Sequence, residues 1–122
     1  MKDKFVLKDS GKREEHKTGA VRDVREGKGR FDLISPFAER RLALVHEKGA
    51  VKYDDRNWEK GIPISRCLDS AKRHINQYIM GMRDEDHLAQ AAWNLFAVMH
   101  FEEVLPEMLD IPNYLERIGK NE

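Results

Sequence analysis

An apolar run in the second half of the chain constrains the fold more than any other feature. Ten of the twelve residues from Leu88 to Met99 are apolar, which is typical of a helix that other elements cover on most sides. The exceptions, Gln90 and Asn94, are four residues apart, and Asp86 lies four residues earlier. At 100° per residue these three side chains lie within about 80° of one another, and His87 lies about 20° from Asn94. The run therefore predicts a buried helix with one polar stripe.

Two further stretches have apolar residues at helical spacing. Ser35-Pro36 predicts a helix start, because Ser is a good N-cap and Pro fits the first helical position. A second helix is predicted from about Ile64 to Met80, with Gly81 as its C-cap. The helix with the polar stripe is predicted from about Asp84 to Val104, and residues 111–118 could form a short last helix. These patterns predict an all-α fold, a small helical bundle of three main helices plus a short C-terminal helix.

The first 35 residues have no sustained helical period and contain four of the eight glycines. They predict an extended arm or a hairpin, with a short strand possible in residues 4–8 (KFVLK). The apolar residues of segment 31–34 (FDLI) could anchor this arm. We therefore predict an extended basic arm over residues 1–35 that packs on a helical domain over residues 36–122. A length of 122 residues fits a single domain overall.

Composition and charge argue against several classes of protein. The chain is 40% hydrophobic and 36% charged, and no apolar run approaches the roughly 20 residues that cross a bilayer. The first residues lack the apolar segment of a signal peptide, and the single Cys67 excludes an intrachain disulfide. We therefore expect a cytoplasmic protein with no membrane contact. Residues 1–30 carry ten Lys or Arg against six Asp or Glu, whereas residues 84–122 carry two against nine. This acidic second half argues against a broad nucleic-acid footprint.

The polar stripe has two open explanations. Polar groups on a buried helix need partners, so Gln90 and Asn94 could bond to neighbouring helices and set their register. Alternatively, the stripe with Asp86 and His87 faces a hydrophilic cleft that holds a metal or a ligand. Carboxylates on facing helices of a bundle commonly build oxygen-rich sites for Mg²⁺ or Mn²⁺.

Glu47 is a second candidate, because it projects from a largely apolar strip of the first helix. If it is buried it should meet a cation or a metal, and exposure at the bundle edge is the alternative. His74 lies near the apolar stripe of the second helix, where a histidine is commonly a core residue. Asp69 and Arg73 have the spacing of an ordinary helical ion pair.

Phosphate contacts could come from the arm, where three glycines in segment 18–34 would let backbone N–H groups approach an anion. The spacing is not that of a P-loop. Tyr53 and Trp58 could stack on a base or pack the turn that contains them. The cations of the arm segment are Arg22, Arg25, Lys28 and Arg30.

Five blocks of sequence, taken in order, resemble a known family. They are TGAVRD (18–23), GKGRFDLI (27–34), GAVKYDDRNWEKGIP (49–63), DSAKRHINQY (69–78) and DEDHLAQAAWN (84–94). Over about residues 18–104 the chain is similar to the phage and prophage dATP/dGTP diphosphohydrolases, the MazZ-like relatives of MazG. The resemblance implies a MazG-like all-α fold and a homodimer or homotetramer with active sites near the subunit contacts. It also implies hydrolysis of a purine deoxynucleoside triphosphate to the monophosphate and pyrophosphate, with Mg²⁺ or Mn²⁺, in the host cytoplasm if the chain is phage-encoded.

The resemblance further implies site residues. MazG-type enzymes carry an EExxDxxxN-like run, against which Asp86 and His87 align with the two Glu positions, Gln90 with the Asp and Asn94 with the Asn. His87 and the neutral Gln90 depart from that pattern, and the ExxE pair of an earlier helix is absent. We therefore predict that Glu47, Asp86 and Asn94 hold the metal. His87 is predicted either to bind the metal itself or to contact a residue that binds it.

The remaining roles complete the prediction. Glu47, His74 and His87 are the predicted catalytic residues, with His74 assisting proton transfer or orienting a phosphate. Two other functions stay open: a catalytically silent nucleotide sensor, favoured by the neutral Gln90, and a phage module that binds nucleic acid or protein through the basic arm. The predicted substrate-binding residues are Arg22, Lys28, Arg30, Lys52, Asn57, Trp58 and Arg73.

Overall fold

The computed structural model describes residues 5–120, which form two compact units, one up to Ile34 and one from Ser35 onward. The first unit is a small hairpin of β1 (Arg13–Glu15) and β2 (Val21–Asp23), paired antiparallel with Arg13 opposite Asp23. The predicted hairpin is therefore present. The strand expected in residues 4–8 is not, because residues 5–8 are irregular and residue 4 lies outside the described range.

Polar contacts hold this first unit together. The carboxylate of Asp23 accepts hydrogen bonds from the Ser10 hydroxyl group and from Lys28 Nζ at 3.2 Å. A 3₁₀ turn, Phe31–Leu33, follows the hairpin. How this arm is placed on the helical unit stays a prediction.

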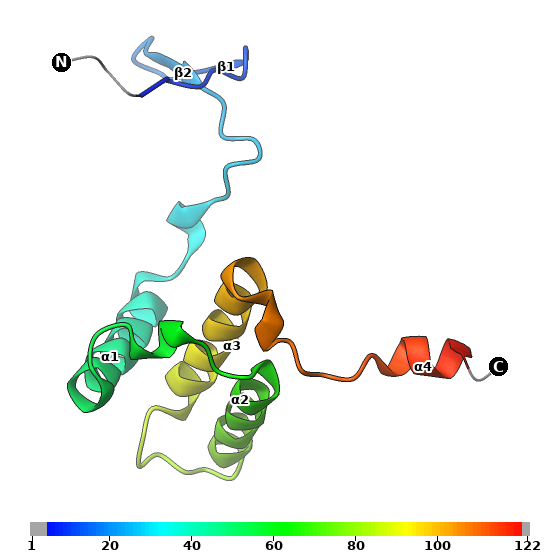
Figure 1. Ribbon diagram of the computed structural model, residues 1–122. Helices are drawn as coiled ribbons and strands as arrows, with labels where there is room; N and C mark the ends of the chain where they lie inside the picture. The colour runs from blue at the N-terminus through cyan, green and yellow to red at the C-terminus, as the bar shows by residue number, and fades with distance from the viewer. Residues whose placement is uncertain (1–4, 121–122) are drawn as a thin grey trace. The chain divides into compact units, whose positions relative to one another are not determined.

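The helical unit contains four α-helices in the described part of the chain, which confirms the all-α prediction (Figure 1). Helix α2 runs along α3, and α1 packs against α3. The bounds are α1 (Pro36–Tyr53), α2 (Ile64–Ile79), α3 (His87–Val104) and α4 (Tyr114–Lys120), with 3₁₀ turns η2 (Asn57–Lys60) and η3 (Pro106–Met108). None of the described helices is long and apolar enough to cross a membrane.

Local chemistry sets the helix ends. The Ser35 hydroxyl accepts a hydrogen bond from Ala38 N at 3.2 Å, so the predicted cap of α1 is confirmed. Asp86 Oδ1 accepts from Ala89 N at 3.0 Å and caps α3. Helix α3 therefore begins at His87, three residues later than predicted, because Asp86 uses its side chain as the N-cap.

The core lies between α2 and α3. Its buried members are Ile64, Cys67, Ala97 and Phe101. Gly61, at φ 113°, lies against η3, where an added Cβ would approach Met108 Sδ to 2.9 Å, so this turn requires glycine.

Helix α3 differs from the expectation of burial on most sides. One side is buried, through residues such as Ala91 and Phe101, but the other leaves Phe96 and Met99 about half exposed. Two neighbouring helices of one chain cover only part of the surface of an apolar helix, which explains the difference.

Candidate active site

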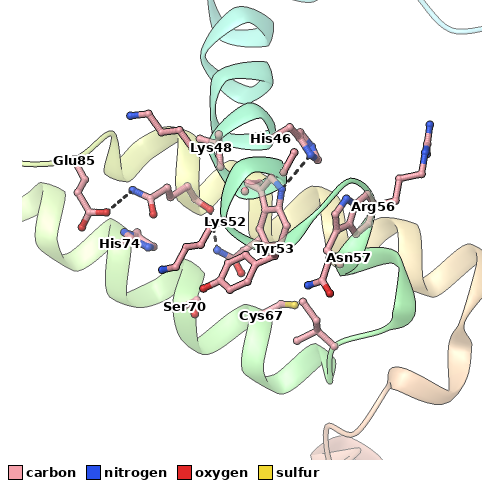
Figure 2. Close-up of a pocket in the computed structure, with 18 of the residues that line it drawn as sticks. His46, Lys48, Lys52, Tyr53, Arg56, Asn57, Cys67, Ser70, His74 and Glu85 are labelled. Atoms are coloured by element: carbon pink, nitrogen blue, oxygen red, sulfur yellow. Dashed lines mark hydrogen bonds between the residues drawn. The ribbon is translucent and has the colours of Figure 1, made fainter.

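A cavity of about 680 Å³ opens between the C-terminal half of α1, η2, α2 and the start of α3 (Figure 2). Its size suits a small-molecule ligand. Besides apolar and small residues, three kinds of side chain line it. The cations are Lys48, Lys52, Arg56 and Arg66, the aromatic and imidazole rings are His46, Tyr53, Trp58, His74 and Trp93, and the acids and amides are Asp54, Asn57, Asp84, Glu85, Gln90 and Asn94.

The cations of the cavity fall into two classes. Arg56 donates to Glu59 Oε1 at 2.7 Å, and Arg66 donates to Asp69 Oδ2 at 3.0 Å. Lys48 and Lys52 are four residues apart on α1, and neither forms an ion pair with a carboxylate among residues 5–120. The ammonium group of Lys52 lies 5.1 Å from the centre of the Tyr53 ring. These two lysines therefore give one wall of the cavity positive charge that no described carboxylate contacts directly, although Lys48 contributes to lowering the pKa of Asp86 without forming an ion pair with it.

Aromatic rings from three elements meet at another part of the cavity. Trp58 of η2 lies edge-on to Trp93 of α3, with ring centres 6.1 Å apart. His46 of α1 lies 5.8 Å from Trp58, and its Nδ1 accepts a hydrogen bond from Trp93 Nε1 at 3.4 Å. Planar rings of this kind offer faces and edges on which a nucleobase can stack.

Two buried histidines connect α2 to α3. His74 Nδ1 lies 2.9 Å from His87 Nδ1, and His87 Nε2 lies 2.9 Å from Asp84 Oδ1. Burial, with further contributions from Arg73 and His87, holds the pKa of His74 below its ordinary value. The hydrogen bond from His87 holds the pKa of Asp84 below its ordinary value. His74 is therefore neutral at neutral pH, and Asp84 is ionised.

Asp84, Glu85 and His87 form a group that could hold a metal ion, since their ligand atoms lie within 4.8 Å of one another. Glu85 also accepts a hydrogen bond from Gln90 Nε2 at 3.3 Å. Both nitrogens of His87 already have partners, so the oxygens of the two carboxylates, each of which can accept more than one contact, are the available metal ligands. Carboxylate and amide oxygens suit Mg²⁺, so this part of the cavity fits such an ion.

Asp86, the first member of the predicted stripe, does not line the cavity. Its carboxylate accepts two hydrogen bonds from Arg41 of α1, at 2.6 and 2.8 Å, in addition to the bond from Ala89. The pKa of Asp86 is lowered, chiefly by Arg41. Gln90 and Asn94 do line the cavity, and Asn94 Nδ2 donates to Gln90 O at 2.8 Å. Asp86, the first residue of the stripe, therefore forms an ion pair with α1, whereas Gln90 and Asn94 line the cavity.

The structure brings together five of the predicted site residues at the cavity: Lys52, Asn57, Trp58, His74 and Asn94. His87 joins them through its hydrogen bond to His74. Glu47 is exposed on α1 and Arg73 is exposed on α2, both away from the lining. The remaining three belong to the first unit, where Arg22 is exposed, Lys28 pairs with Asp23 and Arg30 pairs with Asp32 at 2.8 Å.

Among the lining residues that sequence reasoning missed, five contribute to the chemistry described above: His46, Lys48, Asp84, Glu85 and Trp93. Two signals could have found some of them. Lys48 and Lys52 have i,i+4 spacing on one helix face, and Asp84 lies three residues before His87, within reach of its ring. For His46 and Trp93 the sequence offers no comparable signal, because their neighbours come from other helices.

The fold and the cavity can be set beside known proteins. No curated protein and no solved structure matches the chain. A family model does match, over residues 18–110, and it describes the N-terminal part of dATP/dGTP diphosphohydrolases. The match includes α1, α2 and α3 and every residue that lines the cavity. The chain therefore belongs to the dATP/dGTP diphosphohydrolase family.

Proposed function

We propose that the chain hydrolyses a purine deoxynucleoside triphosphate, dGTP or dATP, to the monophosphate and pyrophosphate, and that the reaction takes place in this cavity with the help of a divalent cation. Family membership supports the general activity. The observation that carries the proposal is the cavity, which combines two lysines that form no direct ion pair, an oxygen-rich acidic group and aromatic rings.

Lys48 and Lys52 are the proposed phosphate-binding residues of the helical unit. Their ammonium groups share one face of α1 and form no direct ion pair with a carboxylate of the described residues. A triphosphate carries several negative charges, and an unpaired lysine in a partly enclosed site attracts them strongly. We further propose that Arg22, Lys28 and Arg30 of the arm and Arg73 of α2 add phosphate contacts.

Asp84 and Glu85 are the proposed holders of Mg²⁺ or Mn²⁺, together with the amide oxygen of Asn94. Such an ion, when bound, neutralises phosphate charge and activates water for attack. Glu47 and Asp86 stay predictions from sequence as further ligands. Asp86 is the weaker of these two, because Arg41 and the α3 backbone already occupy its oxygens.

The nucleoside is proposed to lie against Trp58 and Trp93. These rings provide the stacking surface, and the half-buried Asn57 beside them offers an amide that can donate to or accept from a base edge. A site that hydrogen-bonds a substrate edge discriminates strongly against bases that lack the matching group.

A second copy of the chain is the proposed partner, as a homodimer or homotetramer. Helix α1 has no buried residue, and α3 leaves Leu95, Phe96 and Met99 between 42% and 53% exposed. Apolar surface of this kind is typical of a subunit contact. Light scattering coupled to size-exclusion chromatography tests it, and a purely monomeric protein at micromolar concentration contradicts it.

The decisive experiment is chromatography of the full chain incubated with each dNTP and NTP, with Mg²⁺, with Mn²⁺ and with EDTA. We expect a purine dNMP and pyrophosphate, formed only with the metal. Lys52→Ala should raise KM at least about tenfold, because a phosphate contact of about 1.4 kcal/mol is lost. Lys72→Ala is the matched control, since Lys72 is an exposed lysine of α2 outside the cavity lining. Binding of a dNTP without turnover would instead identify a nucleotide sensor.

A further inference from the structure

Three side chains form a continuous line of hydrogen bonds that ends at the cavity. Asp84 contacts Nε2 of His87, and Nδ1 of His87 contacts Nδ1 of His74, with both distances 2.9 Å. His87 and His74 are buried, with 2% and 5% of their surfaces exposed, and they come from facing helices. Their geometry is therefore held by packing on both sides.

The hydrogen positions in this line follow from the donors and acceptors available. An ionised carboxylate is an acceptor only, so the hydrogen between Asp84 and His87 belongs to His87 Nε2. With one ring hydrogen, on Nε2, His87 has a lone pair on Nδ1, whereas with two ring hydrogens its Nδ1 would donate and the order along the line would reverse. In the neutral form of His87, on which the following assignment rests, Nδ1 is therefore an acceptor.

The second contact assigns the tautomer of His74. Because His87 Nδ1 accepts, the hydrogen between the two rings belongs to His74 Nδ1. The remaining nitrogen, His74 Nε2, then carries a lone pair. It has no hydrogen-bond partner among the described residues, and His74 lines the cavity.

We propose that Asp84 and His87 act as positioning residues that hold His74 in its Nδ1–H tautomer, so that His74 Nε2 presents a hydrogen-bond acceptor to the cavity. Given the proposed function, on which this step rests, the acceptor orients the attacking water by taking a hydrogen bond from it. As the oxygen of that water bonds to the α-phosphorus, the bond from this phosphorus to the bridging oxygen breaks, pyrophosphate leaves, and the proton of the water passes to His74 Nε2. His74 is then the catalytic residue, because it contacts the reacting water. Asp84 and His87 act only by fixing the tautomer of His74.

The tautomer can be read directly by long-range ¹H–¹⁵N NMR of the full chain labelled with ¹⁵N-histidine, in EDTA and without nucleotide. We expect His74 to show a protonated Nδ1 and an unprotonated Nε2, with the reverse pattern for His87. A protonated Nε2 on His74 overturns the proposal. The spectrum needs neither metal nor turnover, so it decides the tautomer even if no dNTP is hydrolysed.

Two substitutions of neighbouring acids test the role of Asp84. Asp84→Ala removes the acceptor for His87, and the His74 signals should then move toward an average of the two tautomers. Glu85→Ala removes the same charge one residue away but touches neither ring through a hydrogen bond. Glu85 acts on His74 only through its charge, so the His74 signals can shift slightly, but Nδ1 should stay the protonated nitrogen. An unchanged His74 pattern in Asp84→Ala would contradict the assignment.

The consequence for catalysis has its own measurement. His74→Phe keeps a ring but removes the acceptor, and it should lower kcat for the preferred dNTP about 100-fold, the low end for loss of a catalytic side chain of this type. The KM should change less than about threefold, because His74 acts on the water rather than on the nucleotide. A retained kcat overturns the catalytic role, whereas absence of hydrolysis by the wild type overturns the proposed function instead.

Discussion

Helix α1 and the α2–α3 pair are built in different ways. The pair shares a core in which Ile64, Cys67, Ala97 and Phe101 are at most 2% exposed. Helix α1 has no buried residue. Two polar contacts join α1 to α3, the ion pair between Arg41 and Asp86 and the hydrogen bond between Trp93 and His46.

Because of this difference, one side of the cavity lies on well-packed helices and the other side lies on a helix with no buried residue. The histidines and the acidic group lie on the well-packed pair, whereas Lys48 and Lys52 are carried by the weakly held helix. Elements with few buried apolar contacts open at low free-energy cost. The proposed catalytic side of the cavity is therefore the rigid one, and the proposed phosphate-binding side is the one that can adjust.

The largest contrast is expected from two phenylalanines. Phe101→Ala removes a fully buried ring from the α2–α3 core, and it should cost about 3–5 kcal/mol of unfolding free energy. Phe37→Ala on α1, where the ring is 80% exposed within a single chain, should change the stability of the monomer by no more than about 0.5 kcal/mol. Urea unfolding of both variants measures the contrast. Similar losses would show that α1 is packed as firmly as the pair.

The next effect concerns the ion pair that joins α1 to α3. Asp86→Ala removes both the cap of α3 and the partner of Arg41, and it should cost about 1–2 kcal/mol. Asp86→Asn keeps a good cap but loses the charge, so it should cost less than about 1 kcal/mol. Hydrogen exchange should show faster opening of α1 than of α2 in both variants. If Asp86→Ala and Asp86→Asn lose equal unfolding free energy, then the ion pair with Arg41, and not the helix cap, supplies most of the stability that Asp86 contributes.

A gain in stability is expected at the end of α1. Asp54 has φ 79° and ψ 159°, a backbone region that non-glycine residues populate only at a cost of about 1–3 kcal/mol. Asp54→Gly relieves this strain but adds freedom to the unfolded chain, so the net gain should be about 1 kcal/mol. Asp55→Gly is the control, since Asp55 is not among the non-glycine residues with positive φ. Thermal unfolding measures both, and a lower Tm for Asp54→Gly contradicts the strain.

The smallest effect is a pH dependence. Because Arg41 lowers the pKa of Asp86 in the folded chain, the folded state binds that proton more weakly than the unfolded state, whose carboxyl titrates near about pH 3.9. The stability from this pair is therefore present above about pH 4 and is lost as the pH falls below it. Both side chains are more than a third exposed, so the effect is small. The Tm difference between wild type and Asp86→Asn should shrink from pH 6 to pH 2.5. A Tm difference that stays constant over this range would show that the ionisation of Asp86 does not contribute to stability.

The prediction from sequence succeeded where the signal is local. Ser35-Pro36 starts α1, and the last residue of α3 was placed correctly. The predicted C-cap of α2 is one residue too late, because Met80 is the cap and Gly81, at φ 94°, follows it. The start of α3 was misplaced because Asp84, Glu85 and Asp86 all suit a first helical turn by charge. Only the hydrogen bond from Ala89 shows which of them is the cap.

For the candidate site, too, the sequence predicted local features but not contacts between elements. Lys52, Trp58 and His74 were identified from their residue types and from the family resemblance, and they line the cavity. Glu47 was singled out by its apolar helical neighbours, yet it is exposed and outside the lining. Helical spacing places a side chain on a face of its own helix, but the neighbouring elements decide whether that face is covered.

The sequence by itself determined the helices, their approximate ends and the family, because caps, apolar spacing and motif blocks act over a few neighbouring residues. The tertiary structure alone decided that Asp86 pairs with Arg41, that Asp84 reaches His87 and His74, and that the aromatic rings of three elements meet. These pairings depend on how α1, α2 and α3 pack. Packing depends on the shapes of surfaces distant in sequence, which spacing along one helix does not encode.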